Sequence, residues 1–142
     1  MHMSADQQQK STNYARRAFG ATLAFSPLLL LIASLIVGII RSQQSSFAAV
    51  GFMIGAAAFA VLNFHLSFIR PRLYFFRHGS MDGYRFVSGL PIVGTVLAVL
   101  GVVFGFGAIG SALVGITAFA LDTGGSGWFV IATWRDHSFW DV

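Results

Sequence analysis

The acidic residue with the most unusual position in this sequence is Asp122. It lies in a mostly apolar stretch, from Ser111 to Trp134, that is long enough to cross a bilayer as a helix. A carboxylate at that depth is costly and is normally kept for an ion, a proton or a polar partner. The glycine-rich segment 123–127 would unwind the backbone and free its amides and carbonyls, as in transporters with discontinuous helices. Asp122 and Thr123 are therefore predicted to form a polar binding site.

Two depths are compatible with the sequence around this carboxylate. If 111–134 crosses the membrane as one broken helix, Asp122 lies close to the bilayer midplane. If the helix ends at Leu121, Asp122 instead begins an interfacial turn, and residues 128–140 lie on the surface or form a shallow re-entrant segment. Both interpretations remain open at this point.

Two further polar residues, Asn63 and His65, lie near the end of another apolar stretch and complete the predicted site. His65 could relay protons or pair with Asp122. Depth argues against a direct pair, because His65 is about 7 Å from Arg70 along a helix, whereas Asp122 would lie about 18 Å from the same surface. The favoured interpretation is that His65 bonds to a nearby carbonyl or reaches the headgroups beside Asn63.

Motifs of catalysis are weak, and we expect no enzymatic activity. The tripeptide 122–124 is that of aspartic proteases, but their dyad needs a second copy. The segment 124–127 resembles the Gly-x-Ser-Gly of rhomboid proteases, whose histidine lies in a later helix, whereas His137 here lies in the tail. His78 and Asp82 are too few ligands for a metal site, and cysteine is absent. We therefore expect no cofactor and no metal.

The elements that position these residues are predicted to be membrane-spanning helices. The chain of 142 residues is 56% hydrophobic and 10% charged, with a mean hydropathy of +0.73, more apolar surface than a soluble domain of this size can bury. Uncharged runs cover 18–40, 47–69 and 86–121, and the last must turn because it has 36 residues. The glycines 105, 107 and 110 are the natural place for that turn.

The predicted fold class is an all-α, polytopic transmembrane helical bundle of four spans in two hairpins, with the fourth helix broken near Asp122–Gly127. The spans are expected at about 18–40, 47–69, 88–105 and 111–134, with a loop at 70–87. Proline disfavours helix in the preceding residue, so the second span should stop by Arg70. Residues 1–17 are expected to be a disordered tail, and 18–142 a single transmembrane domain; Ser88 is a candidate cap for the third helix.

Basic residues predict the orientation of the bundle. Under the four-span model eight of the nine Lys and Arg residues fall on one side, and only Arg41 falls on the other. The positive-inside rule then places both termini in the cytoplasm, and we expect a bacterial inner membrane. Partners should include the anionic headgroups of membrane lipids, and nucleic acid is not expected. Residues expected at the interface are Arg70, Arg72, Arg77, Arg85, Trp128 and Trp134.

Small residues at helical spacing predict two packing faces, since they let helix backbones approach closely in lipid. Ala48, Gly51, Gly55 and Ala58 form one on the second span, and Gly94, Ala98, Gly101 and Gly105 form one on the third. His65 continues the first of these stripes and should face protein. These faces serve packing within the bundle or association with another chain, and the sequence does not decide between the two.

These patterns favour a small, non-enzymatic integral membrane protein that acts by binding: a subunit, an accessory factor or a toxin-immunity protein of a bacterial membrane. A homo-oligomer or another membrane protein is the expected partner. The alternative is an ion- or proton-coupled transporter or channel component that uses Asp122 in the broken helix.

Overall fold

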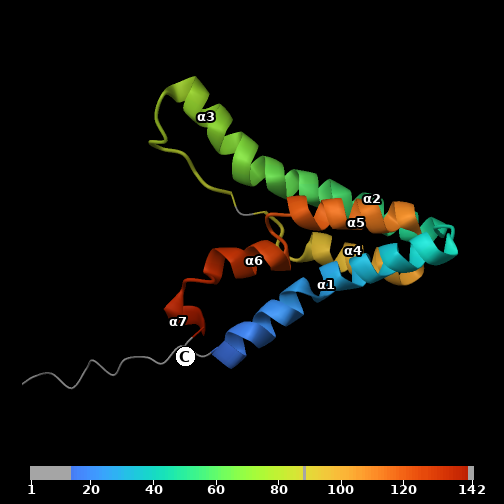
Figure 1. The fold of residues 1–142 in the computed structure, drawn as a ribbon. Helices are drawn as coiled ribbons and strands as arrows, with labels where there is room; N and C mark the ends of the chain where they lie inside the picture. Colours follow the sequence, from blue (N-terminus) through green and yellow to red (C-terminus); the bar gives the residue numbers. More distant parts are fainter. Residues whose placement is uncertain (1–13, 88, 141–142) are drawn as a thin grey trace, which may run out of the picture.

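Four helices pack into a bundle, and shorter helices extend from one of its ends (Figure 1). The computed structural model describes residues 14–87 and 89–140 and contains helices and loops but no strand within those ranges. The bundle helices and the extensions are α1 (Tyr14–Arg41), α2 (Phe47–Phe64), the π-helical turn η1 (His65–Ile69), α3 (Arg70–His78), α4 (Val93–Phe104), α5 (Ile109–Leu121), α6 (Ser126–Thr133) and α7 (His137–Trp140).

Three helical stretches of the described chain are long and apolar enough to cross a membrane: Tyr14–Arg41, Phe47–His78 and Ile109–Thr133, the last including the break between α5 and α6. This fits a small multi-pass integral membrane protein. The predicted third span is shorter than expected, because α4 begins at Val93 instead of residue 88 and has 12 residues. A helix of that length covers about 18 Å, less than a hydrocarbon core of about 30 Å. The four-span arrangement is therefore not confirmed.

The second helix continues through the proline that was expected to stop it, and this prediction was wrong. Between His65 and Ile69 the helix widens into a π-helical turn, and the Arg70 N–H donates to the carbonyl of His65. Pro71 follows directly after this turn, so the N–H that proline lacks falls where the regular i→i−4 bonding is already interrupted. The wide turn thus absorbs the proline without ending the helix.

The segment 70–87, predicted as a loop, begins with the nine-residue helix α3. Gly79 ends this helix in the left-handed conformation (φ 70°), with its N–H donating to the carbonyl of Phe75 at 2.8 Å. In Figure 1, α3 and the pair α6–α7 diverge from each other at the same end of the bundle. The connection to α4 therefore covers residues 79–92.

At the opposite end, the α1–α2 and α4–α5 turns are joined by hydrogen bonds. Ser46 caps α2, accepting from the Ala49 N–H at 3.1 Å and donating to the Phe104 carbonyl at 2.9 Å. The buried Ser34 hydroxyl accepts from the Gly107 N–H at 2.9 Å. Gly107 has φ 83°, a conformation that L side chains rarely adopt. These contacts hold the two helical hairpins together.

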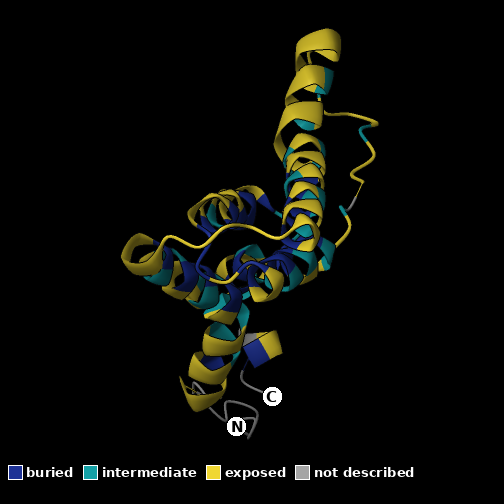
Figure 2. Ribbon diagram, turned by 90° about the vertical axis from the view of Figure 1, so that its right-hand side faces the viewer, coloured by how far each residue is buried: buried dark blue, intermediate teal, exposed yellow. Residues whose placement is uncertain are grey.

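The core lies where α2 packs on α4 and α5, with α1 contributing Leu31, and it contains one cluster of larger side chains and one of alanines. Leu31, Met53, Val102 and Phe119 form one buried cluster, and the second consists of the alanines 56, 60, 98 and 118. Figure 2 shows the buried residues along the centre of the bundle, whereas α3 is largely exposed. At the alanine cluster, small side chains therefore let the backbones of α2 and α4 come close together.

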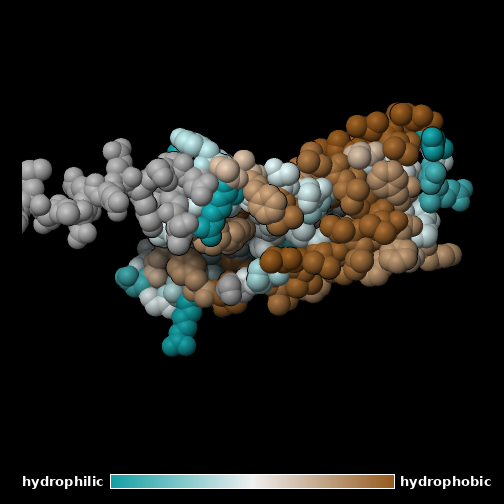
Figure 3. Space-filling model, turned by 90° about the horizontal axis from the view of Figure 1, so that it is seen from below, coloured by the Kyte–Doolittle hydropathy of each residue, from teal (hydrophilic) through white to brown (hydrophobic). Residues whose placement is uncertain are grey.

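Apolar side chains also cover the outside of the bundle. Figure 3 shows hydrophobic residues over most of the visible face, with hydrophilic groups towards its two ends. Large exposed residues include Phe19, Ile40 and Ile54, which are 72%, 75% and 64% exposed. A surface of this kind suits a hydrocarbon environment, since it would be costly in water.

Of the tail predicted at residues 1–17, the last four belong to the first turn of α1, and residues 1–13 lie outside the described part. Ser88, the expected cap of the third helix, also lies outside it. The cap of α4 is instead Ile92, a non-glycine residue with φ 68°. The division into a tail and a single transmembrane domain stays a prediction.

We predict that Gly105→Leu weakens the fold by about 1–3 kcal/mol, the usual cost of overpacking. A Cβ atom at Gly105 would lie 2.6 Å from the Ala49 Cβ, so α4 would have to move away from α2. The matched control is Gly110→Leu, because a Cβ there meets no atom within 4 Å. Unfolding in mild detergent, followed by circular dichroism, should separate the two variants; equal stabilities would contradict the observed packing.

Candidate polar binding site in the broken helix

The side chain of Asn63 connects three separate segments of the chain. Its Nδ2 donates to Asp122 Oδ1 at 2.6 Å and to the Leu90 carbonyl at 3.1 Å. Its Oδ1 accepts from the Leu90 N–H at 3.0 Å. Asn63 is fully buried, so these bonds form away from water. One amide on α2 thus holds the 79–92 connection and the end of α5 together.

Asp122 is the acidic residue of this site, and it is 2% exposed. Its Oδ1 accepts from Asn63 and, at 3.2 Å, from the Gly124 N–H. Its Oδ2 is buried and has no hydrogen-bond partner among the described residues. The two groups that donate hydrogen bonds to Oδ1, the Asn63 amide and the Gly124 N–H, are both neutral. The two oxygens of one carboxylate therefore have very different surroundings.

Four glycines make room for these two side chains. A Cβ atom at Gly89 would collide with Asn63 Oδ1, and one at Gly124 would lie 2.7 Å from Asn63 Nδ2. A Cβ atom at Gly94 would collide with Asp122 Oδ2, and one at Gly125 would lie 3.1 Å from it. The glycines allow two loops and the start of α4 to close around the amide and the carboxylate.

The break between α5 and α6 consists of the turn 122–125. The Asp122 carbonyl accepts from the Gly125 N–H at 2.8 Å, and the Gly124 carbonyl accepts from the Ile92 N–H at 3.0 Å. The hydroxyl of Thr95, on α4, accepts from the Ser126 N–H at 3.4 Å, at the start of α6. The turn is thus bonded to both the 79–92 connection and α4, which fixes the break in place.

As in the second sequence-based interpretation, α5 ends at Leu121 and Asp122 begins the turn that follows it. Its partner Asn63 is about 10 Å from Arg70 along the helix axis, and Arg70 follows the uncharged stretch 47–69. The distance of about 18 Å expected from the sequence assumed one crossing from Ser111 to Trp134, whereas α5 has 13 residues and ends at Leu121, and the chain from there is held beside Asn63.

The other members of the predicted site lie around this pair in different ways. Thr123 Oγ1 lies 2.8 Å from Ser67 Oγ, which links η1 to the turn 122–125. His65 was expected to face protein but is exposed, and no hydrogen bond joins it to Asp122. The residue that pairs with Asp122 is therefore Asn63 and not His65, which the sequence analysis had considered as a possible partner.

The two small-residue stripes behave differently. Gly94, Ala98, Gly101 and Gly105 are buried, and Met53 lies against the Gly101 backbone. On α2, Gly55 is half-buried against Leu97, whereas Gly51 is exposed and a Cβ there would meet nothing within 4 Å. The buried face of α2 is instead made of Ala49, Met53, Ala56, Ala60 and Asn63.

The residues predicted at the interface lie at the end of the bundle where the extensions diverge. Arg72 and Arg77 are exposed on α3, and Arg85 is exposed after it. The Arg70 guanidinium lies 5.9 Å from the ring centre of Tyr84. Trp128 Nε1 donates to the Ala120 carbonyl at 2.9 Å.

Trp134 has a partner that sequence reasoning missed. Arg17 is 6% exposed, and its guanidinium donates to the Trp134 carbonyl at 2.8 Å and lies 5.9 Å from the indole centre. This contact joins the start of α1 to the end of α6. Thr95 and Leu90 were missed too, because no motif marks a backbone group or a lone threonine as part of a site.

The described residues of the weak catalytic motifs make other contacts. The Ser126 hydroxyl donates to the Ala24 carbonyl at 2.7 Å, and this bond joins the start of α6 to α1. His78 Nδ1 lies 3.0 Å from the Tyr74 carbonyl, and Asp82 accepts from Ser80. In the part of the chain that the structure describes, no three His, Cys, Asp or Glu residues cluster as a metal site would require.

Comparisons with known proteins give no relative: no protein-family model, no curated protein and no solved structure matches the chain.

We predict that Asn63→Leu destabilises the fold by roughly 2–4 kcal/mol, because it leaves the Leu90 amide and carbonyl without partners. Hydrogen exchange should speed up at Leu90 and Gly124 before it does in α1. The control is Ser67→Ala, which removes one exposed bond worth on the order of 0.6 kcal/mol. Unchanged exchange at Leu90 in the Asn63 variant would show that the amide does not hold the loops.

Proposed function

We propose that this is a non-enzymatic integral membrane protein that acts by binding, and that the Asn63–Asp122 site binds a small cation. One observation carries the proposal: a carboxylate is buried at the break of a membrane helix, and one of its oxygens has no partner. An acidic residue inside a membrane-spanning segment marks a functional site by default, with an ion or proton as the usual ligand. Binding of an ion or proton by Asp122 would be the basis for a role in ion- or proton-coupled transport.

Electrostatics favours a cation over a neutral ligand. Removing an ionised carboxylate from water costs several kcal/mol, and an opposite charge is the usual compensation. The protein partners of Asp122 are an amide and a backbone N–H, which are both neutral. A bound cation would supply the missing positive charge at Oδ2. None of the residues bonded to the carboxylate titrates, so a cation response can be assigned to Asp122 itself.

The surroundings of Oδ2 favour a cation of small size. A Cβ atom at Gly94 would collide with this oxygen, and one at Gly125 would lie 3.1 Å from it, so little space is left around Oδ2. The Thr95 hydroxyl and the Asp122 carbonyl oxygen each lie 3.0 Å from the Cβ position of Gly125, which brings three oxygens to one side of the turn. A proton or a dehydrated sodium ion suits such a site, whereas a large hydrated ion does not.

We predict that Asp122→Asn abolishes a cation-dependent gain in stability. A ligand that binds only the folded state at 100 times its Kd adds about 2.7 kcal/mol, so the unfolding temperature should rise when sodium replaces choline at constant ionic strength. The asparagine variant keeps an oxygen that can accept from Asn63 and Gly124, so it should still fold.

The matched control for this experiment is Asp82→Asn, which removes the same charge from an exposed loop. It should respond as the original chain does. A sodium effect at constant pH identifies a metal ion, and a pH effect without sodium identifies a proton. The proposal fails if no variant responds to either, or if Asp122→Asn responds as fully as the original chain.

A second binding function is favoured by the open face of α2. Ala48, Gly51 and Ala58 are all exposed, so a smooth strip of this helix is left free of contacts within the chain. In lipid, helices associate through such surfaces because their backbones can come close. A subunit, accessory factor or toxin-immunity protein would use this strip to bind a transmembrane helix, either of another protein or of a second copy. The basic residues would place both termini on the cytoplasmic side of a bacterial membrane.

We predict that Gly51→Ile prevents this association while the fold persists, since the added side chain meets open space. Gly110→Ile is the control, because it adds the same bulk at another open helical glycine. The chain contains no cysteine, so single cysteines at Ala48 can report contact with a partner by cross-linking. Cross-linking that is equal in the two isoleucine variants would rule out the α2 strip as the contact.

A further inference from the structure

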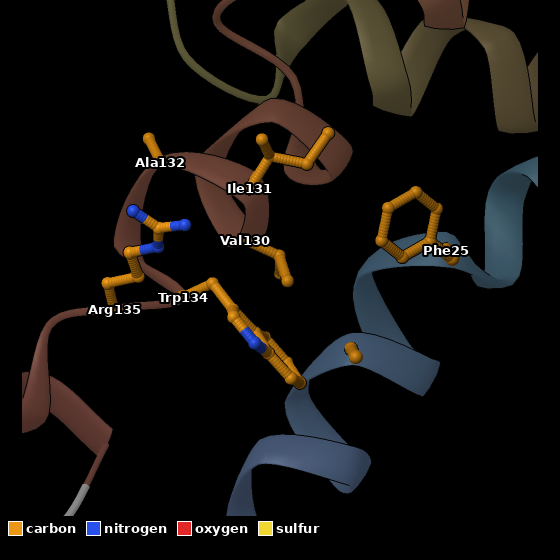
Figure 4. A pocket seen from close by; sticks show the side chains of 7 residues that line it. Phe25, Val130, Ile131, Ala132, Trp134 and Arg135 are labelled. Atoms are coloured by element: carbon orange, nitrogen blue, oxygen red, sulfur yellow. The ribbon is translucent and has the colours of Figure 1, made fainter.

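A cavity of about 490 Å³ separates α1 from α6, away from the Asn63–Asp122 site. Ala21 and Phe25 line it from α1, and Val130, Ile131 and Trp134 line it from α6, with Arg135 at its edge. In Figure 4 the Trp134 indole extends from α6 toward α1, and Phe25 lies across the gap from Val130. The walls are apolar except at the end formed by Arg135.

The contact between Arg17 and Trp134 gives the depth of this cavity. Arg17 immediately precedes the uncharged run 18–40, and its bond to the Trp134 carbonyl holds the end of α6 at the same level. Arginine and tryptophan at the end of an apolar run are typical of the headgroup layer. Ala21 and Phe25 lie about 6 and 12 Å further along α1, toward the hydrocarbon. The cavity therefore runs from the headgroup layer into the apolar layer.

The cavity has a basic group at one end and apolar walls along the rest, which matches the phosphate and acyl chain of a phospholipid. A guanidinium binds a phosphate by charge-assisted hydrogen bonds, and Arg135 is exposed and forms no ion pair with a described residue. The neighbouring carboxylate of Asp136 is occupied by Ser138, whose N–H and hydroxyl donate to Oδ1 at 2.9 and 2.6 Å. Below the guanidinium, aliphatic and aromatic walls suit an acyl chain.

We propose that the α1–α6 cavity is a binding site for one anionic phospholipid, with its phosphate on Arg135 and an acyl chain between Phe25 and Val130. The α6 helix has only eight residues and is tied to α1 near its two ends, by Ser126 to Ala24 and by Arg17 to Trp134. The lipid fills the space between these two ties. The inference depends on the membrane location of the chain but not on cation binding by Asp122.

The test is lipid retention by the full chain, purified from nanodiscs of phosphatidylglycerol or phosphatidylcholine and measured by native mass spectrometry. We expect one phosphatidylglycerol per chain and at least tenfold weaker retention of it in Arg135→Gln. Arg77→Gln removes an equal charge from exposed α3 and should retain lipid as the original chain does. Asp122→Asn should also retain it, which separates this inference from the cation site.

A second variant tests the acyl-chain part of the cavity without changing charge. Ala21→Phe would fill the space beside Phe25 and should displace the lipid while the helical circular dichroism is kept. Arg135→Lys keeps the charge but not the two-pronged geometry and should fall between the original chain and Arg135→Gln. Equal retention of both lipids, equal losses in the Arg77 and Arg135 variants, or retention by Ala21→Phe would each overturn the site.

Discussion

The arrangement of this protein depends on one buried amide, that of Asn63. Without it, the Leu90 N–H and carbonyl in the 79–92 connection would have no partner inside an apolar protein, and the Asp122 carboxylate would lose one of its two donors. The amide donates to the Leu90 carbonyl, accepts from the Leu90 N–H and also donates to Asp122. Irregular backbone can therefore lie buried beside α2, and a short α4 and a broken α5–α6 pair become compatible with a stable bundle.

Much of the fold could be predicted from hydrophobicity, because the length of an uncharged run is a physical requirement of the bilayer. The first hairpin and the break near Asp122 follow from that length and from the glycines. Pro71 misled the prediction, since proline excludes an ordinary interior turn but not the first turn after a π-helical widening. The late start of α4 depends on Asn63, a contact 27 residues away that no local pattern contains.

The sequence identified Asn63 and Asp122 as members of the candidate site, but their direct hydrogen bond was harder to predict. Asp122 and Asn63 are 59 residues apart, and counting along a single helix from Ser111 to Trp134 does not bring them together, because α5 ends at Leu121. A signal was nevertheless present on α2. Ala49, Met53, Ala56, Ala60 and Asn63 follow helical spacing as well as the glycine stripe does, and this second stripe ends in an amide. A polar residue at the end of a small-residue stripe indicates the face that meets the protein better than glycine alone.

The π-helical turn at His65–Ile69 has a geometric consequence for everything that follows it. A wide turn holds about one extra residue, and each residue rotates a helix by about 100°. The side chains of α3 are thereby turned out of phase with those of α2. The helix face that carries Asn63 and packs into the bundle therefore does not continue along α3. The aromatic and basic residues of α3 thus take their orientation from this local phase shift, independently of the periodicity that packs α2.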